Sequence, residues 1–202
     1  EFRQIPVAKR GELMDAACKE AAGTMASILT NGSVGADVFK KICGDCGIWV
    51  ANYNSPMQTV ISGGVEGVAK AVELFKAVPG VRRVVPLNVA GGFHSGMMAG
   101  AGEKLRAVLA DVPVREPVLP VAQNFTGKLV EDYTTVKENL AQQVAGSVHW
   151  IDCVNALSST GADTFIEFGP GTVLTGLIRK IDSTKTVMNV QSAEDLDKLV
   201  IE

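Results

Sequence analysis

Between Thr24 and Val89 the spacing of apolar residues changes repeatedly between a period of two and a period of 3.6, which restricts the fold more than any other feature of the sequence. Turn signals such as Asn31-Gly32 and Pro79-Gly80 separate the apolar segments. The pattern predicts strands over residues 24–30, 48–53, 58–62 and 81–89 and helices over residues 33–46 and 65–77. Ser33 is expected to cap the first of these helices. The order β-α-β-β-α-β within about 65 residues is that of the split βαβ, or ferredoxin-like, arrangement.

The residues on both sides of this module alternate between helical patterns and short apolar strands. We expect helices over residues 7–22, 95–111, 134–144, 149–160 and 172–181, and strands over residues 118–125, 164–168 and 186–190. Such alternation is typical of an α/β layer with a mostly parallel sheet. We therefore predict an α/β protein in which residues 1–22 and 90–202 form one subdomain and residues 23–89 are inserted between its two parts.

The charges are nearly balanced, with 19 Lys and Arg residues against 22 Asp and Glu residues, and they are well mixed along the chain. This distribution argues against a nucleic-acid-binding protein, because phosphate binding needs clustered Lys and Arg. No apolar run approaches the ~18 residues of a membrane span, which argues against a membrane protein. A hydrophobic share of 47% excludes a disordered chain and is sufficient for a core.

The four cysteines are too few and too scattered for the disulfide framework of a small secreted domain, which favours a reducing compartment. Cys43 and Cys46 form a lone CxxC pair, whereas structural zinc requires four ligands, so no metal site is predicted. The pair also falls at the carboxyl end of a predicted helix, away from the end of the dipole that lowers the pKa of a thiol. A buried thiol at a helix C-terminus is therefore the expected structure.

The chain has two histidines, which limits the search for a general base. His94 follows two glycines where a long strand is expected to give way to a helix, and functional groups of α/β proteins gather at such strand ends. Catalysis and a structural role are both open for His94 on this reasoning alone. His149, beside Trp150, is better explained by helix capping or surface packing.

A histidine base needs a nucleophile, and the sequence has no Gly-x-Ser-x-Gly elbow. Ser95 follows His94 directly, but neighbouring side chains at the start of a helix diverge. The nucleophile is therefore expected to lie outside this chain. The loop Gly169-Pro170-Gly171 has the place of a phosphate-binding loop but lacks the lysine of a P-loop. Arg10, taken alone, is more typical of a solvated or surface-paired side chain than of a substrate-binding residue.

Six segments share a family resemblance and follow the family's order across nearly the whole chain. They are Lys9-Arg10-Gly11-Glu12-Leu13-Met14, Val50-Ala51-Asn52-Tyr53-Asn54-Ser55-Pro56 with Gln58, Ile61-Ser62-Gly63, Gly92-Phe93-His94, Asn124-Phe125-Thr126-Gly127, and Phe168-Gly169-Pro170-Gly171 with Leu174. Together they resemble the malonyl-CoA:acyl carrier protein transacylases of fatty-acid synthesis, to which the acyltransferase domains of polyketide synthases are related.

The resemblance implies an α/β-hydrolase-like large subdomain, incomplete in this chain, that is interrupted by a ferredoxin-like small subdomain. It also implies ping-pong acyl transfer, in which a serine attacks the malonyl thioester, a histidine takes the proton, and the phosphopantetheine thiol of acyl carrier protein receives the malonyl group. By matching position, His94 is that base, with its ring oriented by a main-chain carbonyl and Gln143 as the matching glutamine. No bound cofactor is implied, because malonyl-CoA and phosphopantetheine are substrates.

The same resemblance implies four substrate contacts. Arg10 is expected to pair with the free malonyl carboxylate, because a planar guanidinium binds a carboxylate bidentately and selects diacids. Phe93 matches the bulky residue of malonyl-selective members, where a ring crowds the α-methyl group of methylmalonyl. Asn52 and Asn54 fall where the family lines the cleft between its subdomains, and we expect them to contact the CoA or pantetheine arm.

One departure from the family is large, because the Gly-Gln-Gly loop and the serine elbow of its amino-terminal part are missing. We therefore expect a carboxy-terminal fragment that is inactive without the missing segment as a partner. The alternatives are a noncatalytic relative that binds acyl-CoA or acyl carrier protein, a polyketide synthase acyltransferase fragment, and a structural domain.

Acyl carrier protein, the expected partner, is acidic, so a basic surface should dock it. The candidates for this surface are Arg82, Arg83, Arg179 and Lys180. Bacterial cytoplasm, plastids and mitochondria all host such enzymes.

Overall fold

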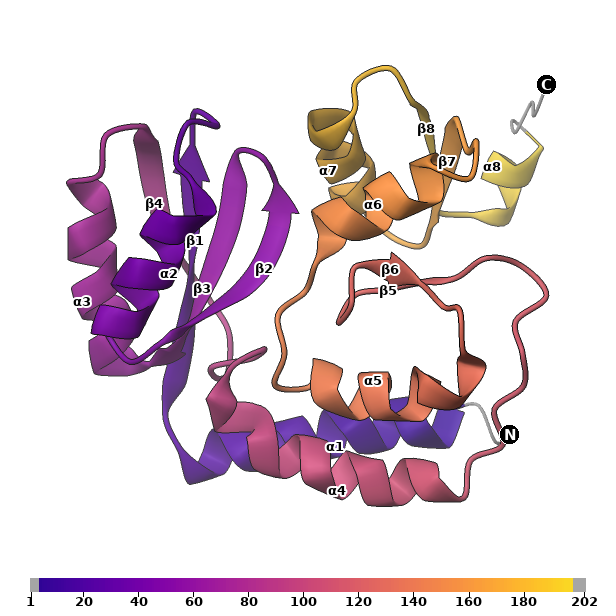
Figure 1. The fold of residues 1–202 in the computed structure, drawn as a ribbon, viewed down its shortest axis with the longest axis horizontal. Coiled ribbons are helices and arrows are strands. Elements are labelled where there is room, and N and C mark those ends of the chain that lie inside the picture. Colours follow the sequence, from indigo (N-terminus) through magenta and orange to yellow (C-terminus); the bar gives the residue numbers. More distant parts are fainter. Residues whose placement is uncertain (1–3, 198–202) are drawn as a thin grey trace.

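The computed structural model describes residues 4–197 and places the inserted module beside the flanking helices (Figure 1). The module is a four-stranded antiparallel sheet of β1 (Gly23–Thr30), β2 (Trp49–Ser55), β3 (Gln58–Gly64) and β4 (Val81–Leu87). The strands lie in the order β2-β3-β1-β4. Two helices, α2 (Ala36–Asp45) and α3 (Val65–Lys76), follow β1 and β3. The predicted order β-α-β-β-α-β is confirmed.

The core of this module lies between its sheet and its two helices. Ile28 of β1, Ile61 of β3 and Phe75 of α3 are completely buried in it. Phe75 packs against Phe39 of α2, with the two ring centroids 5.0 Å apart. The apolar spacing along the two helices thus reflects a face that each of them turns toward the sheet.

The first helix of the module begins later than expected, because Ser33 does not cap it. The side-chain Oδ1 of Asn31 accepts hydrogen bonds from the Ser33 backbone N–H, at 2.9 Å, and from its hydroxyl, at 2.6 Å. These bonds close an Asx turn, which orients the Ser33 side chain toward Asn31 and away from the start of the helix. α2 therefore starts at Ala36, with Gly35 in the N-cap position and no side-chain cap.

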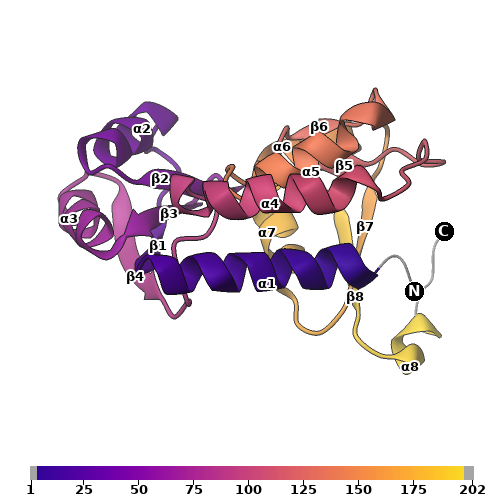
Figure 2. The ribbon, with the colours of Figure 1, turned by 90° about the horizontal axis from the view of Figure 1, so that it is seen from below.

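Three helices outside the module pack together, namely α1 (Gln4–Glu20), α4 (Ala99–Ala110) and α5 (Val136–Gln143) (Figure 2). α4 contacts both α1 and α5, and a 3₁₀ turn over Gly96–Met98 leads into it. A bidentate ion pair joins α4 to α5, because Arg106 Nε and Nη2 each lie 2.7 Å from a carboxylate oxygen of Glu138. No helix among residues 4–197 has the length and apolar character to cross a membrane.

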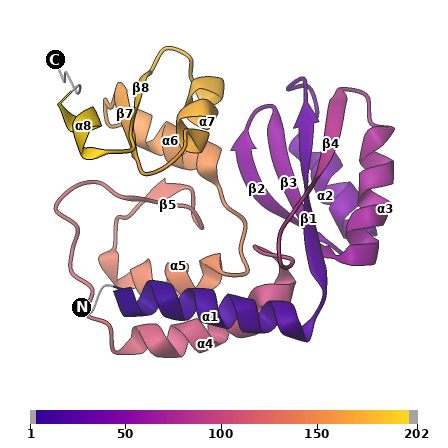
Figure 3. The same ribbon diagram turned by 180° about the vertical axis from the view of Figure 1, so that it is seen from behind.

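The remaining elements form two small sheets with their helices, visible from behind in Figure 3. They are the antiparallel pair β5 (Ala122–Gln123) and β6 (Lys128–Leu129), a 3₁₀ turn over Tyr133–Thr135, α6 (Trp150–Ser158), the parallel pair β7 (Thr164–Phe168) and β8 (Thr186–Val190), α7 (Val173–Ile181), and α8 (Ala193–Leu196). Of the mostly parallel sheet predicted for the flanking residues, the described part contains the parallel pair β7 and β8, whereas β5 and β6 form a separate antiparallel pair.

The strand expected over residues 118–125 is reduced to the two residues of β5. Pro117 and Pro120 have no N–H group to donate to a sheet, and Val118 between them is 99% exposed. The apolar composition of this segment therefore does not reflect burial within the chain.

Candidate active site

His94 lies in the loop that joins β4 to the 3₁₀ turn before α4, and its backbone conformation is unusual. With a φ of 54°, it is the only residue other than glycine that has a positive φ within residues 4–197. Side-chain-bearing residues seldom adopt this conformation, and such strain is concentrated at functional sites. The hydroxyl of Ser95 donates a hydrogen bond of 2.5 Å to the Gly92 carbonyl. Ser95 therefore does not pair with His94, as its position next to the histidine predicts.

Two main-chain carbonyls hold the His94 ring. Its Nδ1 lies 3.1 Å from the Gln143 carbonyl oxygen and 3.2 Å from that of Gly146. The Gln143 side-chain amide nitrogen lies farther from Nδ1, at 3.5 Å, and donates instead to the carbonyls of Gly146 and Ser147. Because carbonyls only accept hydrogen bonds, we assign the proton of the neutral ring to Nδ1, which leaves the ring Nε2 unprotonated. The carbonyl of Gln143 thus lies against the ring at the position that the family resemblance implies. The contact of Gly146 could not be predicted from its residue type, since every residue has a carbonyl. Its glycine is nevertheless required by packing, because a Cβ at this position would lie 2.6 Å from the ring of Phe125.

Burial is the main cause that lowers the pKa of His94, and the positive charge of Arg10 lowers it further. The hydrogen bonds to the two carbonyls act in the opposite direction, because they favour the protonated ring. The net effect is a lowered pKa, so the imidazole is neutral at neutral pH. A neutral ring with Nε2 unprotonated is the form that a general base requires.

An NMR titration is expected to give His94 a pKa below the value of about 6.5 for an unperturbed histidine. The folded state then binds this proton less tightly than the unfolded state does. The corresponding stability is fully present above the unfolded pKa and is lost as the pH falls through the folded pKa. Urea unfolding of a His94→Asn variant should lack this part of the pH dependence. A measured pKa at or above about 6.5 would contradict the prediction.

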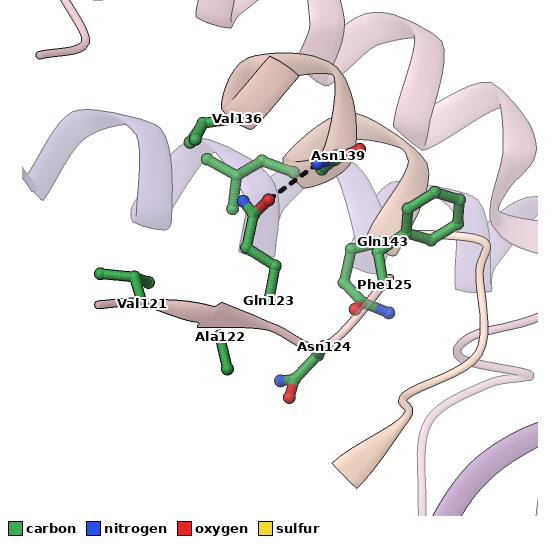
Figure 4. A pocket seen from close by; sticks show the side chains of 9 residues that line it. Val121, Ala122, Gln123, Asn124, Phe125, Val136, Asn139 and Gln143 are labelled. Atoms are coloured by element: carbon green, nitrogen blue, oxygen red, sulfur yellow. Dashed lines mark hydrogen bonds between the residues drawn. The ribbon is translucent and has the colours of Figure 1, made fainter. Parts of the chain in front are cut away.

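The side chain of Gln143 braces the turn that follows α5. Its Nε2 donates hydrogen bonds to the carbonyls of Gly146, at 2.8 Å, and Ser147, at 3.2 Å. Its Oε1 is buried and has no hydrogen-bond partner among the described residues. Gln143 also lines a pocket of 330 Å³ between residues 121–125 and α5, where Asn139 donates a hydrogen bond of 2.7 Å to Gln123 Oε1 (Figure 4).

Arg10 lies on α1 and is half-buried. Within residues 4–197 no carboxylate or other acceptor binds its guanidinium, and burial lowers its pKa. Its positive charge lowers the pKa of His94, an effect that requires the two side chains to lie near each other. An unpaired, partly desolvated guanidinium is suited to bind a carboxylate ligand through two hydrogen bonds.

The other predicted site residues lie in the loop directly before His94 and on β2. Phe93 is partly buried and contacts both the core around Met98 and the small cluster of Met25, Ala51 and Val60 on the sheet. Asn52 and Asn54 lie on the edge strand β2, are partly exposed, and make no side-chain hydrogen bond to any described residue. Their amide groups are therefore open to a ligand.

His149 occupies the N-cap position of α6 but makes no side-chain capping hydrogen bond. Its ring instead stacks on Tyr53, with centroids 5.4 Å apart, and its Nδ1 lies 3.3 Å from Asp152 Oδ2. Of the two expectations for His149, packing is therefore confirmed and capping is wrong.

The loop Gly169-Pro170-Gly171 is not an open anion site. The carboxylate of Glu167 accepts hydrogen bonds from the backbone N–H groups of Leu174, at 3.1 Å, and Thr175, at 2.8 Å, at the start of α7. Gly171 N–H donates to Gln191 Oε1 at 2.8 Å. The groups that a phosphate would need are thus already bound, and the negative charge of Glu167 opposes a second anion.

Among the described residues, neither the CxxC cysteines nor the basic candidates make a hydrogen bond or an ion pair with His94 or Arg10. Burial raises the pKa of Cys43 to about 12, as expected for an unreactive thiol at the end of α2. No group of three His, Cys, Asp or Glu side chains that could hold a metal occurs in the part of the chain that the structure describes.

Arg82 and Arg83, two of the basic docking candidates, are exposed on the edge strand β4. Arg179 lies in the last turn of α7, next to Lys180, and donates a hydrogen bond of 3.2 Å to the Val187 carbonyl.

Comparisons of sequence and of structure with known proteins find relatives that carry the same kind of name. The malonyl CoA-acyl carrier protein transacylase of Bacillus subtilis (strain 168) is 36% identical over 196 residues, which are 95% of this chain. The malonyl CoA-acyl carrier protein transacylase structure from Clostridium perfringens Atcc 13124 has a TM-score of 0.86 at 34% identity and covers 96% of this chain. A type II PKS acyl-carrier protein in complex with its malonyl-transacylase has a TM-score of 0.86 at 30% identity and covers 94%.

This chain spans 61% of the length of each of these three relatives. The sequence model of the family described as acyl transferase domain matches residues 6–199, which is nearly the whole chain. The matched region includes His94 and Arg10 together with both carbonyls that hold the imidazole. The chain therefore belongs to the acyl transferase domain family.

Proposed function

We propose that this chain is the part of a malonyl-CoA:acyl carrier protein transacylase that supplies the general base and the carboxylate-binding residue. Residues 1–22 and 90–202 then belong to its α/β-hydrolase-like large subdomain, and residues 23–89 are its ferredoxin-like small subdomain. The observation that carries this proposal is a neutral imidazole, held through Nδ1, near a half-buried arginine that no described residue binds. A serine outside these residues supplies the nucleophile.

In the first half of the reaction, His94 Nε2 takes the proton of the serine hydroxyl while the serine oxygen attacks the malonyl thioester carbonyl. The carbon–sulfur bond breaks, and the CoA thiolate leaves with that proton. In the second half, Nε2 takes the proton of the phosphopantetheine thiol, whose sulfur attacks the malonyl ester. The carbon–oxygen bond to the serine breaks, and the serine oxygen recovers the proton from the imidazolium. The Gln143 and Gly146 carbonyls favour the imidazolium in both halves.

The guanidinium of Arg10 binds the free carboxylate of the malonyl group. It meets that carboxylate without first breaking an internal ion pair, because no described residue holds it. Phe93, which precedes the base, crowds an α-methyl substituent and so favours malonyl over methylmalonyl. Asn52 and Asn54 contact the CoA or pantetheine arm with their side-chain amides. Malonyl-CoA and the arm of acyl carrier protein are substrates, and no resident cofactor takes part.

Acyl carrier protein is the proposed acceptor, and electrostatic attraction brings it to a basic surface. Arg82 and Arg83 are the stronger candidates, since both are exposed on the edge of the sheet. Lys180 and Arg179 are the weaker pair, because the Arg179 guanidinium is already bonded to a carbonyl.

The Arg10→Ala variant tests this function through substrate choice. With the serine-bearing segment supplied, the variant should lose malonyl transfer relative to acetyl transfer by on the order of 10- to 100-fold, the effect of a charge-assisted hydrogen-bonded pair. Steady-state kinetics with malonyl-CoA and acetyl-CoA measures this ratio. Arg115→Ala removes an exposed arginine of the segment after α4 and should keep the parent preference. An unchanged preference in Arg10→Ala would rule out the carboxylate contact.

A further inference from the structure

The connection between α5 and α6 lies along the free edge of β2, beside which it runs in Figure 1. The Val148 N–H donates to the Ala51 carbonyl at 2.7 Å, and the Tyr53 N–H donates to the Val148 carbonyl at 2.9 Å. The hydroxyl of Ser147 donates a third hydrogen bond, of 2.6 Å, to the Val50 carbonyl. We call residues 146–148 the strap.

The strap begins at one of the groups that hold the imidazole. Its first residue, Gly146, supplies one of the two carbonyls at His94 Nδ1, and the other comes from Gln143 at the end of α5. Gln143 Nε2 bonds the carbonyls of both Gly146 and Ser147. The acceptors of the ring and the strap are therefore one braced turn, and a shift of the strap along β2 would move both carbonyls.

Of the three bonds between the strap and β2, only that of Ser147 comes from a side chain. The two backbone bonds form with almost any sequence, whereas the third requires a hydroxyl at position 147. Ser147 and Val50 are 97 residues apart in the sequence. The bond therefore ties the turn after α5, which contacts the His94 ring, to the inserted sheet of residues 23–89.

We propose that Ser147 is a positioning residue for His94, which ties the turn carrying the two carbonyls to β2 and thereby keeps the proton of the neutral imidazole on Nδ1. The inference rests on the proposed function in one respect, because an unprotonated Nε2 matters only if His94 acts as a general base. Without the hydroxyl, the turn moves against β2, the two carbonyls lose their fixed distance to Nδ1, and the ring exchanges between its two tautomers.

The ring ¹⁵N resonances of the 202-residue chain, recorded above the pKa of His94, test this proposal. An imidazole held in one tautomer gives two widely separated ¹⁵N resonances, and exchange between tautomers brings them together. We expect separated resonances for His94 in the parent chain and a shift of both toward their mean in Ser147→Ala. Amide exchange at Val148 should become roughly 2- to 10-fold faster, as for the loss of one hydrogen bond. The chain has two histidines, so His149→Gln assigns the spectrum.

Two further variants separate positioning from general stability. Ser147→Thr keeps the hydroxyl and should keep the resonances separated. Ser159→Ala removes a comparable hydroxyl bond, of 2.7 Å to the Ala156 carbonyl at the end of α6, and should leave His94 unchanged. The proposal is overturned if Ser147→Ala keeps the parent resonances or if Ser159→Ala shifts them equally. If Ser147→Ala does not fold, Ser147→Thr becomes the test. Separated ¹⁵N resonances of His94 in Ser147→Thr would then support the proposal, and averaged resonances would overturn it.

This readout needs no acyl transfer. Unchanged resonances in Ser147→Ala would therefore overturn the role of Ser147 and leave the proposed function standing. Loss of the proposed function, conversely, would appear as malonyl transfer that does not depend on His94, whatever the state of its tautomers.

Discussion

Malonyl transfer, measured with the serine-bearing segment supplied, is expected to fall by about 10²- to 10⁴-fold when His94 is replaced by alanine, because this is the contribution of a positioned general base. The loss should appear in both half-reactions, since Nε2 takes a proton in each. Transfer of radiolabelled malonyl groups to the serine, and from it to acyl carrier protein, measures the two steps separately.

The matched control for this variant is His149→Ala, which removes the other histidine of the chain. His149 stacks on Tyr53 and pairs with Asp152, so its loss affects packing at the start of α6 and leaves the proton transfers intact. We expect His149→Ala to keep a rate close to that of the parent. Full activity of His94→Ala would show that the imidazole is not the base.

The second large effect concerns stability. Phe75→Ala is expected to lower the free energy of unfolding by about 3–5 kcal/mol, the usual cost of removing a large buried aromatic side chain. Phe75 is completely buried between α3 and the sheet, and its loss leaves Phe39 and Ile28 facing a cavity. Since whole domains are stable by only about 5–15 kcal/mol, the inserted module should unfold at much lower urea concentration.

Circular dichroism during urea unfolding measures this change, and the neighbouring Leu74→Ala variant is its control. Leu74 lies on the same helix but is 42% exposed, so its truncation should cost well under half of the Phe75 effect. A loss below about 1 kcal/mol in Phe75→Ala would mean that the helices of the module contribute little to its stability.

The inserted module could be predicted from the sequence because its elements are encoded locally. Val68 and Phe75 of α3 repeat at helical spacing and meet the sheet, and Pro79-Gly80 ends the segment before β4. Ser33 shows the limit of such reasoning, since its side chain is turned toward Asn31, only two residues away, and does not cap α2. Local patterns do not say which of two neighbouring partners a hydroxyl will choose.

The candidate site could be predicted only in part. His94 and Arg10 are conspicuous residue types, and their matching positions in the family placed them together. The carbonyl of Gly146 and the contact of Ser147 with β2 depend on backbone atoms distant in sequence, for which residue type gives no signal. Glu167 was missed for a similar reason, because its carboxylate reaches the start of α7 only after β7 and the following loop have folded.

The left-handed backbone at His94 sets two requirements of this chain against each other. A residue with a Cβ costs about 1–2 kcal/mol in that conformation, whereas glycine adopts it freely. Glycine, however, has no imidazole. Any variant library that is sorted only for resistance to heat should therefore enrich glycine at this position and discard the chemistry, a trade-off between stability and activity confined to a single residue.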